Sequence, residues 1–524
     1  MAETIVYRRK RKRSKNPSDI TEPEDVRFKT LSTDNGHEKM IVYKRRNITK
    51  MQIEDHLEAG REVIMPTGER HEREIISANG KHGQIIGHKG GTLRGTQLND
   101  LPEDILCSII SRLPLGDAVR TSILSTKLRR IWASHPNLSF TKRAMFPKSK
   151  IKGGEQIKFA LIEGMHAVLK QHRGNGVERI FLKALLDQNT SSALNTCVKF
   201  AVTSGTTSLS LLLSPERPYC FPTYLFNLQN GSRSVLEELH LKYVSLRIPA
   251  GFTGFKHLKR LNLDCMYDIV ADELQALLKN CLLLEVLCIN VVYKFEKLVI
   301  SQALSHLRYL SLTACLGVKT IEVAAANVER FEYEGSSDNS IVFPQPLKKV
   351  KYASLKWGAF NSHVGEFVLS VLPRSFPGLE TLVWKTYGVE MDGLPNCLGR
   401  FQCLKSVHIE LCAPVFACDV LSLAALLDAA PSLESFFLKL IGFINVPYSG
   451  IEEFRRLPSF PHHHIKSVGI KEFTCSRDQI ELVEYILENA TALEHMIIKT
   501  KIGCYRDAAI NSPYIKKDKR VVIL

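Results

Sequence analysis

Two short motifs contain residue types that could bind a ligand directly. Gly83 and Gly87 bound a Gly-x-x-Gly loop, which in some RNA-binding domains clamps the nucleic-acid backbone, and His462, His463 and His464 are potential metal ligands. Such a loop must lie between two helices, but the following residues 92–96 form a poor helix. Three consecutive histidines cannot all face one ion. We therefore predict no nucleic-acid or metal site at these motifs.

Motifs for catalysis are also missing from the sequence. It has no Gly-x-Ser-x-Gly elbow, no Gly-x-x-x-x-Gly-Lys phosphate loop and no His-Glu-x-x-His pair. The 13 cysteines include no pair at Cys-x-x-Cys spacing, which argues against a zinc or redox motif and favours reduced thiols. We expect no catalytic residue, no metal and no cofactor.

The composition is that of an ordinary globular protein, with 44% hydrophobic and 24% charged residues among 524. Without an apolar leader or a run of 18 apolar residues, we predict an intracellular protein that does not span a membrane. The net charge is +16, and seven of the residues 8–15 are Lys or Arg. This run, from Arg8 to Lys15, is a candidate nuclear-import signal or a solvated tail, so we expect the nucleus, the cytoplasm or both. Residues 1–96 lack periodicity and are predicted to be disordered.

The residues from Asn99 to Phe140 predict three short helices. The first follows Leu101-Pro102-Glu103-Asp104 and carries an apolar helical stripe, which residues 113–116 (Leu-Pro-Leu-Gly) interrupt. Two further amphipathic stretches follow, and the third contains Leu128 and Trp132. Three helices in about 40 residues make too small a core to be stable alone. A partner or the next domain must therefore cover one apolar face.

A repeated pattern, apolar-x-x-apolar-x-apolar, occupies the rest of the chain. Its eleven clear copies recur every 19–32 residues, with two weaker copies before them at Val177 and Thr206; the clear copies start at Leu236, Leu258, Leu284, Leu307, Val328, Leu347, Leu379, Leu404, Leu433, Ile465 and Leu493. The lengths and the pattern match leucine-rich repeats, in which each unit supplies one short strand of a parallel sheet. We therefore predict a solenoid.

The second residue of every clear copy is charged, and its sign alternates along the chain: Glu237, Lys259, Glu285, Arg308, Glu329, Lys348, Glu380, Lys405, Glu434, Lys466 and Glu494. Stacked repeats place equivalent positions about 5 Å apart. We predict a ladder of opposite charges beside the sheet, in which each exposed step contributes at most about 1 kcal/mol.

Side chains alternate between the two faces of a strand, so Leu239 and Leu241 are expected inside the solenoid. The same alternation predicts a concave, target-binding sheet surface that includes His240, Arg260, Asn262, Tyr309, Ser311, Arg330, Lys349, His408 and Phe437. Its charges are mixed in sign, which favours a protein partner over a phosphate backbone.

Two segments also resemble a known family. Leu101-Pro102-x-Asp104-Ile105-Leu106, Leu113-Pro114 and Arg129-Arg130-x-Trp132 are similar to an F-box. The resemblance implies that the small adaptor subunit of SCF-type ubiquitin ligases, the S-phase kinase-associated protein type, contacts Leu101, Pro102, Ile105, Leu106, Ile109, Leu113, Pro114, Val119, Leu124 and Trp132. Leu128 departs from the pattern, since many F-boxes carry Trp there. An unrelated three-helix subdomain is the alternative interpretation.

Beyond Leu404 the chain resembles the FBD region of plant F-box/FBD/LRR-repeat proteins, through the segments from His464 to Val468 and from Gln479 to Met496. The alternative is a last pair of repeats with a capping role. The predicted fold is α/β: a disordered extension (1–96), a three-helix F-box (97–140), an irregular leucine-rich-repeat solenoid with a parallel sheet (141–403), an FBD region that continues the repeats (404–510) and a tail (511–524).

The resemblance implies a non-enzymatic, substrate-recruiting subunit of a cullin–RING ubiquitin ligase. Its F-box would bind the adaptor, and through it the cullin, while the repeats bind a target protein. Two alternatives remain at this point: a repeat scaffold whose F-box-like segment does not engage the ligase, and an RNA-binding protein that uses the basic run and the Gly-x-x-Gly loop.

Overall fold

The computed structural model describes residues 101–146, 153–174, 176–214, 216–227, 235–266, 269–292, 296–314, 318–336, 339–358, 363–387, 399–412, 419–443, 447–448, 453–501, 503–513, 515 and 518–524. The predicted disordered extension, with its basic run and its Gly-x-x-Gly loop, lies outside these residues, so those three interpretations stay predictions. Residues 93–524 form one compact unit.

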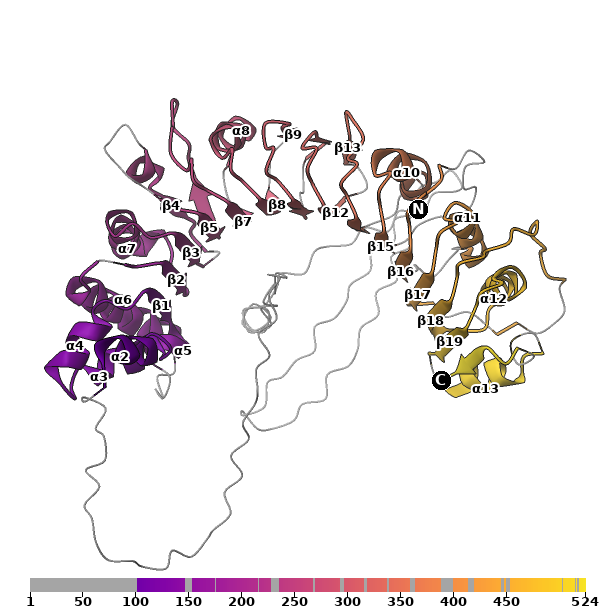
Figure 1. The fold of residues 1–524 in the computed structure, drawn as a ribbon, viewed down its shortest axis with the longest axis horizontal. Helices are drawn as coiled ribbons and strands as arrows, with labels where there is room; N and C mark the ends of the chain where they lie inside the picture. The colour runs from indigo at the N-terminus through magenta and orange to yellow at the C-terminus, as the bar shows by residue number, and fades with distance from the viewer. Residues whose placement is uncertain are drawn as a thin grey trace, which may run out of the picture. The chain divides into compact units, whose positions relative to one another are not determined.

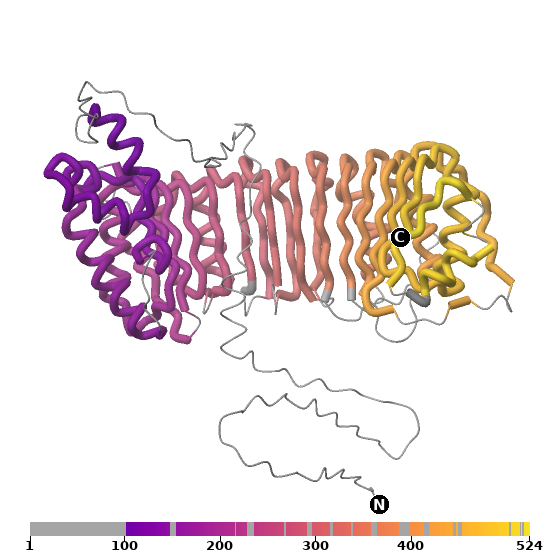
Figure 2. The backbone as a smooth tube through the Cα atoms, turned by 90° about the horizontal axis from the view of Figure 1, so that it is seen from below, coloured from indigo at the N-terminus to yellow at the C-terminus, as the bar shows by residue number. Residues whose placement is uncertain are grey.

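A parallel sheet is the central element of this unit, as predicted, and it has 15 strands among the described residues (Figures 1 and 2). The strands lie side by side in chain order along a curved solenoid and line its inner side (Figure 1). They are β1 (Asn137–Thr141), β2 (Arg179–Lys183), β3 (Ser208–Leu212), β5 (Glu238–Lys242), β7 (Arg260–Met266), β8 (Val286–Val292), β10 (Tyr309–Thr313), β12 (Arg330–Ser336), β14 (Tyr352–Gly358), β15 (Thr381–Tyr387), β16 (Ser406–Cys412), β17 (Ser435–Ile441), β18 (Ser467–Phe473), β19 (His495–Thr500) and β20 (Val521–Ile523).

The connections between these strands carry helices on the outer side of the curve (Figure 1). The α-helices of the repeats are α5 (Lys142–Met145), α6 (Gly154–Gln171), α7 (Ser191–Thr203), α8 (Ala271–Asn280), α9 (His363–Glu366), α10 (Leu372–Ser375), α11 (Ala424–Asp428), α12 (Arg477–Asn489) and α13 (Gly503–Asn511). Single turns complete them: η2 (Gln188–Thr190), η3 (Thr223–Phe226), η5 (Phe367–Val371) and η6 (Val420–Leu423). Two small parallel sheets join β4 (Tyr219–Phe221) to β6 (Val244–Leu246), and β9 (Lys297–Ile300) to β11 (Thr320–Val323) and β13 (Ser340–Val342).

Strict alternation of side chains builds the core. In β5, Leu239 and Leu241 are buried while His240 between them is partly exposed, and the same pattern holds in β16 and β17. Each buried pair packs against its neighbours above and below, so one hydrophobic core runs through all the repeats. The period of two thus separates an apolar outer layer, covered by helices, from the inner face of the sheet.

Among the described residues, three helices precede the sheet, as the sequence predicts: α2 (Glu103–Ile110), α3 (Leu115–Thr121) and α4 (Thr126–Trp132). Glu103 and Asp104 lie in the first turn of α2, where acids favour the positive end of the helix dipole. The Ser125 hydroxyl accepts a hydrogen bond from the Leu128 amide at 3.1 Å and caps α4. The interruption predicted at residues 113–116, between the first two helices, ends earlier than expected. Pro114 takes the N-cap position, and α3 begins directly after it.

The backbone confirms that the predicted ladder positions are stacked. The amide of each ladder residue donates to the carbonyl of the one before it, for example Lys259 to Glu237 at 2.7 Å and Glu329 to Arg308 at 2.8 Å. Side-chain ion pairs also close steps of this ladder, at 2.9 Å between Lys259 and Glu237 and at 3.0 Å between Lys351 and Glu380. The hydrogen bond from Lys351 lowers the pKa of Glu380 below its usual value.

One rung of the predicted ladder is wrong. The sixth repeat places Lys351, not Lys348, in the ladder, since the Lys351 amide donates to Glu329 and the Glu380 amide donates to Lys351. The sequence pattern favoured Leu347 as the start of this repeat. The correct start has the small residue Ala353 at an apolar position, where it is fully buried in β14. The sign is unchanged, so the alternation survives, but Lys349 is exposed before β14 and does not belong to the inner face.

Two strands of the sheet are missing from the sequence-based prediction. β1 falls inside the segment assigned to the three-helix unit; its ladder position is Pro136, which has no charge, although its carbonyl accepts from Glu178 at 2.9 Å. β20 lies in the segment predicted to be a tail, residues 511–524, and pairs with β19. The weaker copies at Val177 and Thr206 are real repeats, since they lead into β2 and β3.

The segment that resembles an FBD region continues the same sheet through β16–β20. Its predicted helical stripe is α12, whose Ile480, Val483 and Ile486 are buried. The carboxylate of Glu481, 2% exposed, also faces inward and binds the guanidinium groups of Arg455 and Arg477 at 2.5–2.9 Å. A charged hydrogen-bond network therefore joins the connection before β18 to α12.

We expect the charge ladder to stabilise the stacked repeats. Lys259→Glu would place three acids in succession, with Glu237 and Glu285 on either side, and should lower the free energy of unfolding by about 1 kcal/mol or less. Urea unfolding at low and high salt measures this loss, which should shrink as salt screens the charges. Lys256→Glu makes the same charge change at an exposed residue outside the ladder. Equal losses in both variants would show that alternation contributes nothing.

Candidate protein-interaction surfaces

One side of the three-helix unit is docked onto the repeats. Helix α3 packs against α5 and β1, which both belong to the first repeat. Gly116 makes this approach possible, because a Cβ atom there would collide with the backbone carbonyl of Met145. The next domain thus covers one of the unit's apolar faces, as its small core requires.

Away from this contact, the unit exposes aliphatic side chains to solvent. The exposed fraction is 45% for Ile105 and 37% for Ile109 on α2, and 83% for Ile123 and 67% for Leu124 in the turn after α3. Exposed apolar side chains gathered on one small unit are typical of a protein-binding surface. Ile123 was missing from the predicted contact residues although its apolar character was visible in the sequence.

Two predicted contact residues need correction. Leu106 (0% exposed) and Trp132 (1%) are buried in the core between the helices, so they support the surface from beneath and do not belong to it. Leu128 is buried too, at 1%, so the departure from Trp at this position leaves the exposed surface unchanged. Of the remaining predicted contacts, Pro102 and Pro114 are exposed, whereas Leu101, Leu113 and Val119 are half-buried against the core.

The inner face of the sheet is the second surface. The structure places eight of the predicted residues on the inner face of the sheet: His240, Arg260, Asn262, Tyr309, Ser311, Arg330, His408 and Phe437. Lys349 is the exception described above. Ser311 occupies the right position but is only 7% exposed, so little of it is available to a partner.

Electrostatics along this face differ between its two halves. At the third inner-face position of each strand, the residues from β5 to β12 are Lys242, Asp264, Asn290, Thr313 and Glu334, a mixed set. From β14 to β19 the equivalent residues are Lys356, Lys385, Glu410, Lys439, Lys471 and Lys499. The prediction of mixed sign therefore holds only for the first half. We call the five lysines of the second half the basic row.

Ionisable groups beside the basic row respond to it. Burial lowers the pKa of His408, and the lysines nearby lower it further, whereas the carboxylate of Glu410, 3.5 Å away, acts in the opposite direction. Burial acts against ionisation of Glu410, but the hydrogen bond and charge of Lys385, 3.0 Å away, hold the pKa of this carboxyl below its usual value. His408 also packs edge-on against Phe437, with ring centroids 4.4 Å apart.

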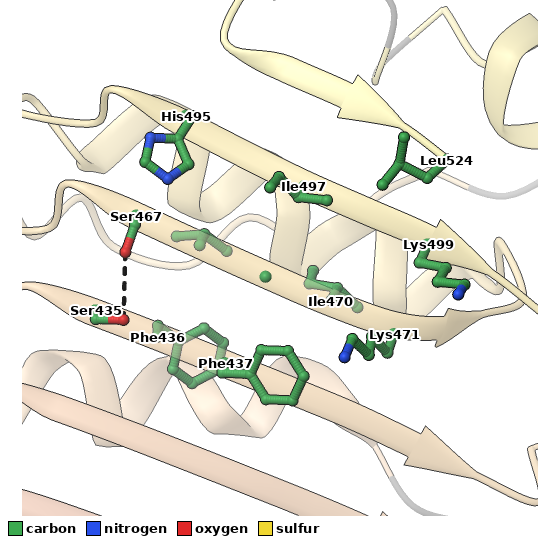
Figure 3. Close-up of a pocket in the computed structure, with 12 residues that line it drawn as sticks. Ser435, Phe436, Phe437, Ser467, Ile470, Lys471, His495, Ile497, Lys499 and Leu524 are labelled. Atoms are coloured by element: carbon green, nitrogen blue, oxygen red, sulfur yellow. Dashed lines mark hydrogen bonds between the residues drawn. The ribbon is translucent and has the colours of Figure 1, made fainter. Parts of the chain in front are cut away.

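A hollow of about 260 Å³ opens on the inner face at β17–β19 (Figure 3). Gly469 lies between Phe437 and Ile497 in the strand register and carries no side chain to fill the space. A Cβ atom there would lie 2.9 Å from the Phe437 ring. Lys471, Lys499 and Leu524 stand around the hollow at the carboxyl ends of the strands (Figure 3). The hollow combines an apolar floor with a basic rim.

Other kinds of site find no support in the described part of the chain. No group of His, Cys, Asp and Glu residues there could hold a metal ion, and no helix there is long and apolar enough to cross a membrane. The three consecutive histidines face different partners: His462 lies against Tyr485, His463 against Thr491, and His464 against the Pro431 carbonyl.

Comparison with known families agrees with this architecture. Residues 98–140 match a family model described as the F-box domain, and residues 168–520, more than half of the chain, match one described as the At1g61320/AtMIF1 LRR domain. The chain belongs to the F-box/FBD/LRR-repeat family. Members of this family combine an F-box with a leucine-rich-repeat array, and this combination indicates an adaptor-like role in protein interaction.

Two relatives match most of the chain at low identity, and a third matches a short segment at higher identity. The F-box/FBD/LRR-repeat protein At1g13570 of Arabidopsis thaliana is 26% identical over 78% of this chain and 91% of its own length. The family member At5g56420 from the same plant is 24% identical over 77% of this chain and 92% of its own length. A third, At5g22700, is 53% identical over 45 residues, which are 9% of this chain and 10% of that protein.

We expect the docking of the F-box to depend on Gly116. Gly116→Ala should force α3 away from Met145 and destabilise the junction by about 1–3 kcal/mol. Hydrogen exchange should quicken in α3, α5 and β1, while the strands β16–β19 keep their protection because solenoid units depend on their neighbours. Gly154→Ala is the matched control, since nothing lies within 4 Å of a Cβ atom added at the start of α6. Equal protection in the two variants would contradict the close-approach argument.

Proposed function

We propose that this protein is the substrate-recruiting subunit of an SCF-type ubiquitin ligase. Its F-box binds the small adaptor subunit, and through it the cullin, while the inner face of the repeats binds a target protein. The chemistry of ubiquitin transfer belongs to other subunits. The protein acts by proximity, since it holds the target near the charged conjugating enzyme.

The observation that carries the proposal is the two-sided F-box. One side is docked onto the repeats through Gly116, and the other exposes Ile105, Ile109, Ile123 and Leu124. Burying one such side chain at an interface contributes about 1.5–3 kcal/mol. The exposed set therefore suits a stable protein contact. The resemblance to the F-box and the family membership give this contact its expected partner.

Substitution of the exposed apolar residues tests the proposed adaptor contact. Ile105→Asp with Leu124→Asp should leave two charges buried without partners at the interface and weaken adaptor binding by well over tenfold. Both side chains are exposed in the free protein, so its melting temperature should change little. Co-purification of the purified chain with the adaptor measures the binding, and thermal melting monitors the fold.

Phe159→Asp provides a matched control, because Phe159 is an equally exposed (67%) apolar residue on α6, outside the F-box. It should leave adaptor capture unchanged. Failure of the wild-type chain to capture any adaptor would favour the alternative function, a repeat scaffold that does not engage the ligase. Capture that survives both F-box substitutions would place the contact on other residues.

A further inference from the structure

The basic row contains two lysines that differ from the rest. Lys356 pairs with Glu334 at 2.5 Å, Lys385 with Glu410 at 3.0 Å, and Lys439 with Glu472 at 3.8 Å. Lys471 and Lys499, by contrast, have no carboxylate within 4.0 Å among the described residues, and both are exposed. These two are direct neighbours in the register of β18 and β19. Adjacent like charges repel each other, so an anion placed between them would be stabilised.

These two lysines form the rim of the apolar hollow. The Lys471 ammonium lies over the Phe437 ring, 5.0 Å from its centroid, and this cation–π contact holds the charge at the edge of the hollow. Ile497, 40% exposed, forms the opposite wall (Figure 3). The floor consists of the backbone at Gly469 and the buried Val468 and Ile470. An apolar group and an anionic group must therefore lie close together in any well-matched occupant.

We propose that this hollow recognises an acidic peptide segment of the recruited protein. One apolar side chain of the segment enters the space between Phe437 and Ile497, and flanking carboxylates pair with Lys471 and Lys499. At the amino ends of β17 and β18, small polar side chains leave room for the peptide backbone, and Ser467 donates a hydrogen bond to Ser435 at 3.2 Å. His495 is the equivalent residue of β19. This inference rests on the proposed function, because it assigns the target-binding role to one part of the inner face.

The distribution of charge favours a peptide over a nucleic acid. A phosphate backbone binds best to a long stripe of cations that all lack partners. Here the carboxylates of Glu334, Glu410 and Glu472 pair with lysines of the basic row and would repel phosphates. Two adjacent cations beside an apolar hollow match instead a short segment in which acids flank an aliphatic or aromatic residue.

Selection from a displayed library of random twelve-residue peptides tests the inference on the intact purified chain. We expect the enriched peptides to carry a net negative charge around one apolar residue. Fluorescence anisotropy should then show binding that weakens several-fold between low and high salt. Lys471→Glu with Lys499→Glu should weaken the binding at least tenfold. Gly469→Val, which fills the hollow, should do the same, and thermal melting checks that both variants fold.

Lys348→Glu with Lys349→Glu is the matched control, because it makes the same charge change at exposed lysines before β14, away from the inner face. This variant should bind the selected peptides as the wild type does. Neutral or basic consensus peptides, or acidic peptides that bind the hollow variants normally, would overturn the proposal. So would the absence of any binder, or competition by a single-stranded oligonucleotide that binds at the same lysines more tightly than the peptides do.

Adaptor capture distinguishes this failure from failure of the proposed function. The F-box and the hollow lie at opposite ends of the chain, so the Lys471/Lys499 variant should capture the adaptor as the wild type does. If adaptor capture holds while no acidic peptide binds, the ligase function stands and the peptide site is wrong. If the wild type binds acidic peptides but captures no adaptor, the hollow stands and the protein is a scaffold.

Discussion

The parallel hydrogen bonding between successive repeats is the constraint on which the other features depend. Each strand must present its backbone amides to the carbonyls of the strand before it, as Lys259 and Arg260 both do to Glu237. This pairing fixes the spacing of the repeats at about 4.8 Å and makes alternate side chains point to opposite faces. The outer layer can then be filled with leucines, while the residues of the inner face fall into straight rows. A charge at one strand position therefore always lies beside the equivalent residue of the next repeat.

The two rows of charge show the consequences of this geometry. Before the strands, signs alternate from Glu237 to Glu494, so that each charge lies beside charges of opposite sign in the neighbouring repeats. At the other end of the strands, lysines follow one another from β14 to β19 with one glutamate among them. The first arrangement places opposite charges beside each other, and ion pairs form at the steps Lys259–Glu237 and Lys351–Glu380. The second pairs three of its lysines with carboxylates but leaves the positive charges of Lys471 and Lys499 on the inner face, where an anionic partner would be attracted.

The F-box and the FBD region extend this construction at its two ends. The F-box covers the first repeat with one side and exposes aliphatic residues on the other, so its docking and its binding surface are parts of one small unit. The FBD region adds strands to the same sheet and holds its long connection with the buried carboxylate of Glu481. Because a lone buried carboxylate is unfavourable, Arg455 and Arg477 must accompany it.

The sequence by itself determined the features that depend on local periodicity. Helical stripes predicted α2–α4 and α12, and the spaced leucines with their charged neighbours predicted the solenoid, the alternation of faces and all but one rung of the ladder. Local pattern failed where a small or uncharged residue fills a standard position, as Ala353 does in β14 and Pro136 does before β1. Only the tertiary structure decided which apolar residues of the F-box are exposed, because helix packing buries Leu106 and Trp132 but leaves Ile105 and Ile123 in solvent. It also brought together Phe437, Gly469 and Ile497, and set Lys471 beside Lys499. These residues lie about thirty positions apart in the chain, and connections of unequal length separate them, so no local pattern encodes their contact; the register of the sheet does.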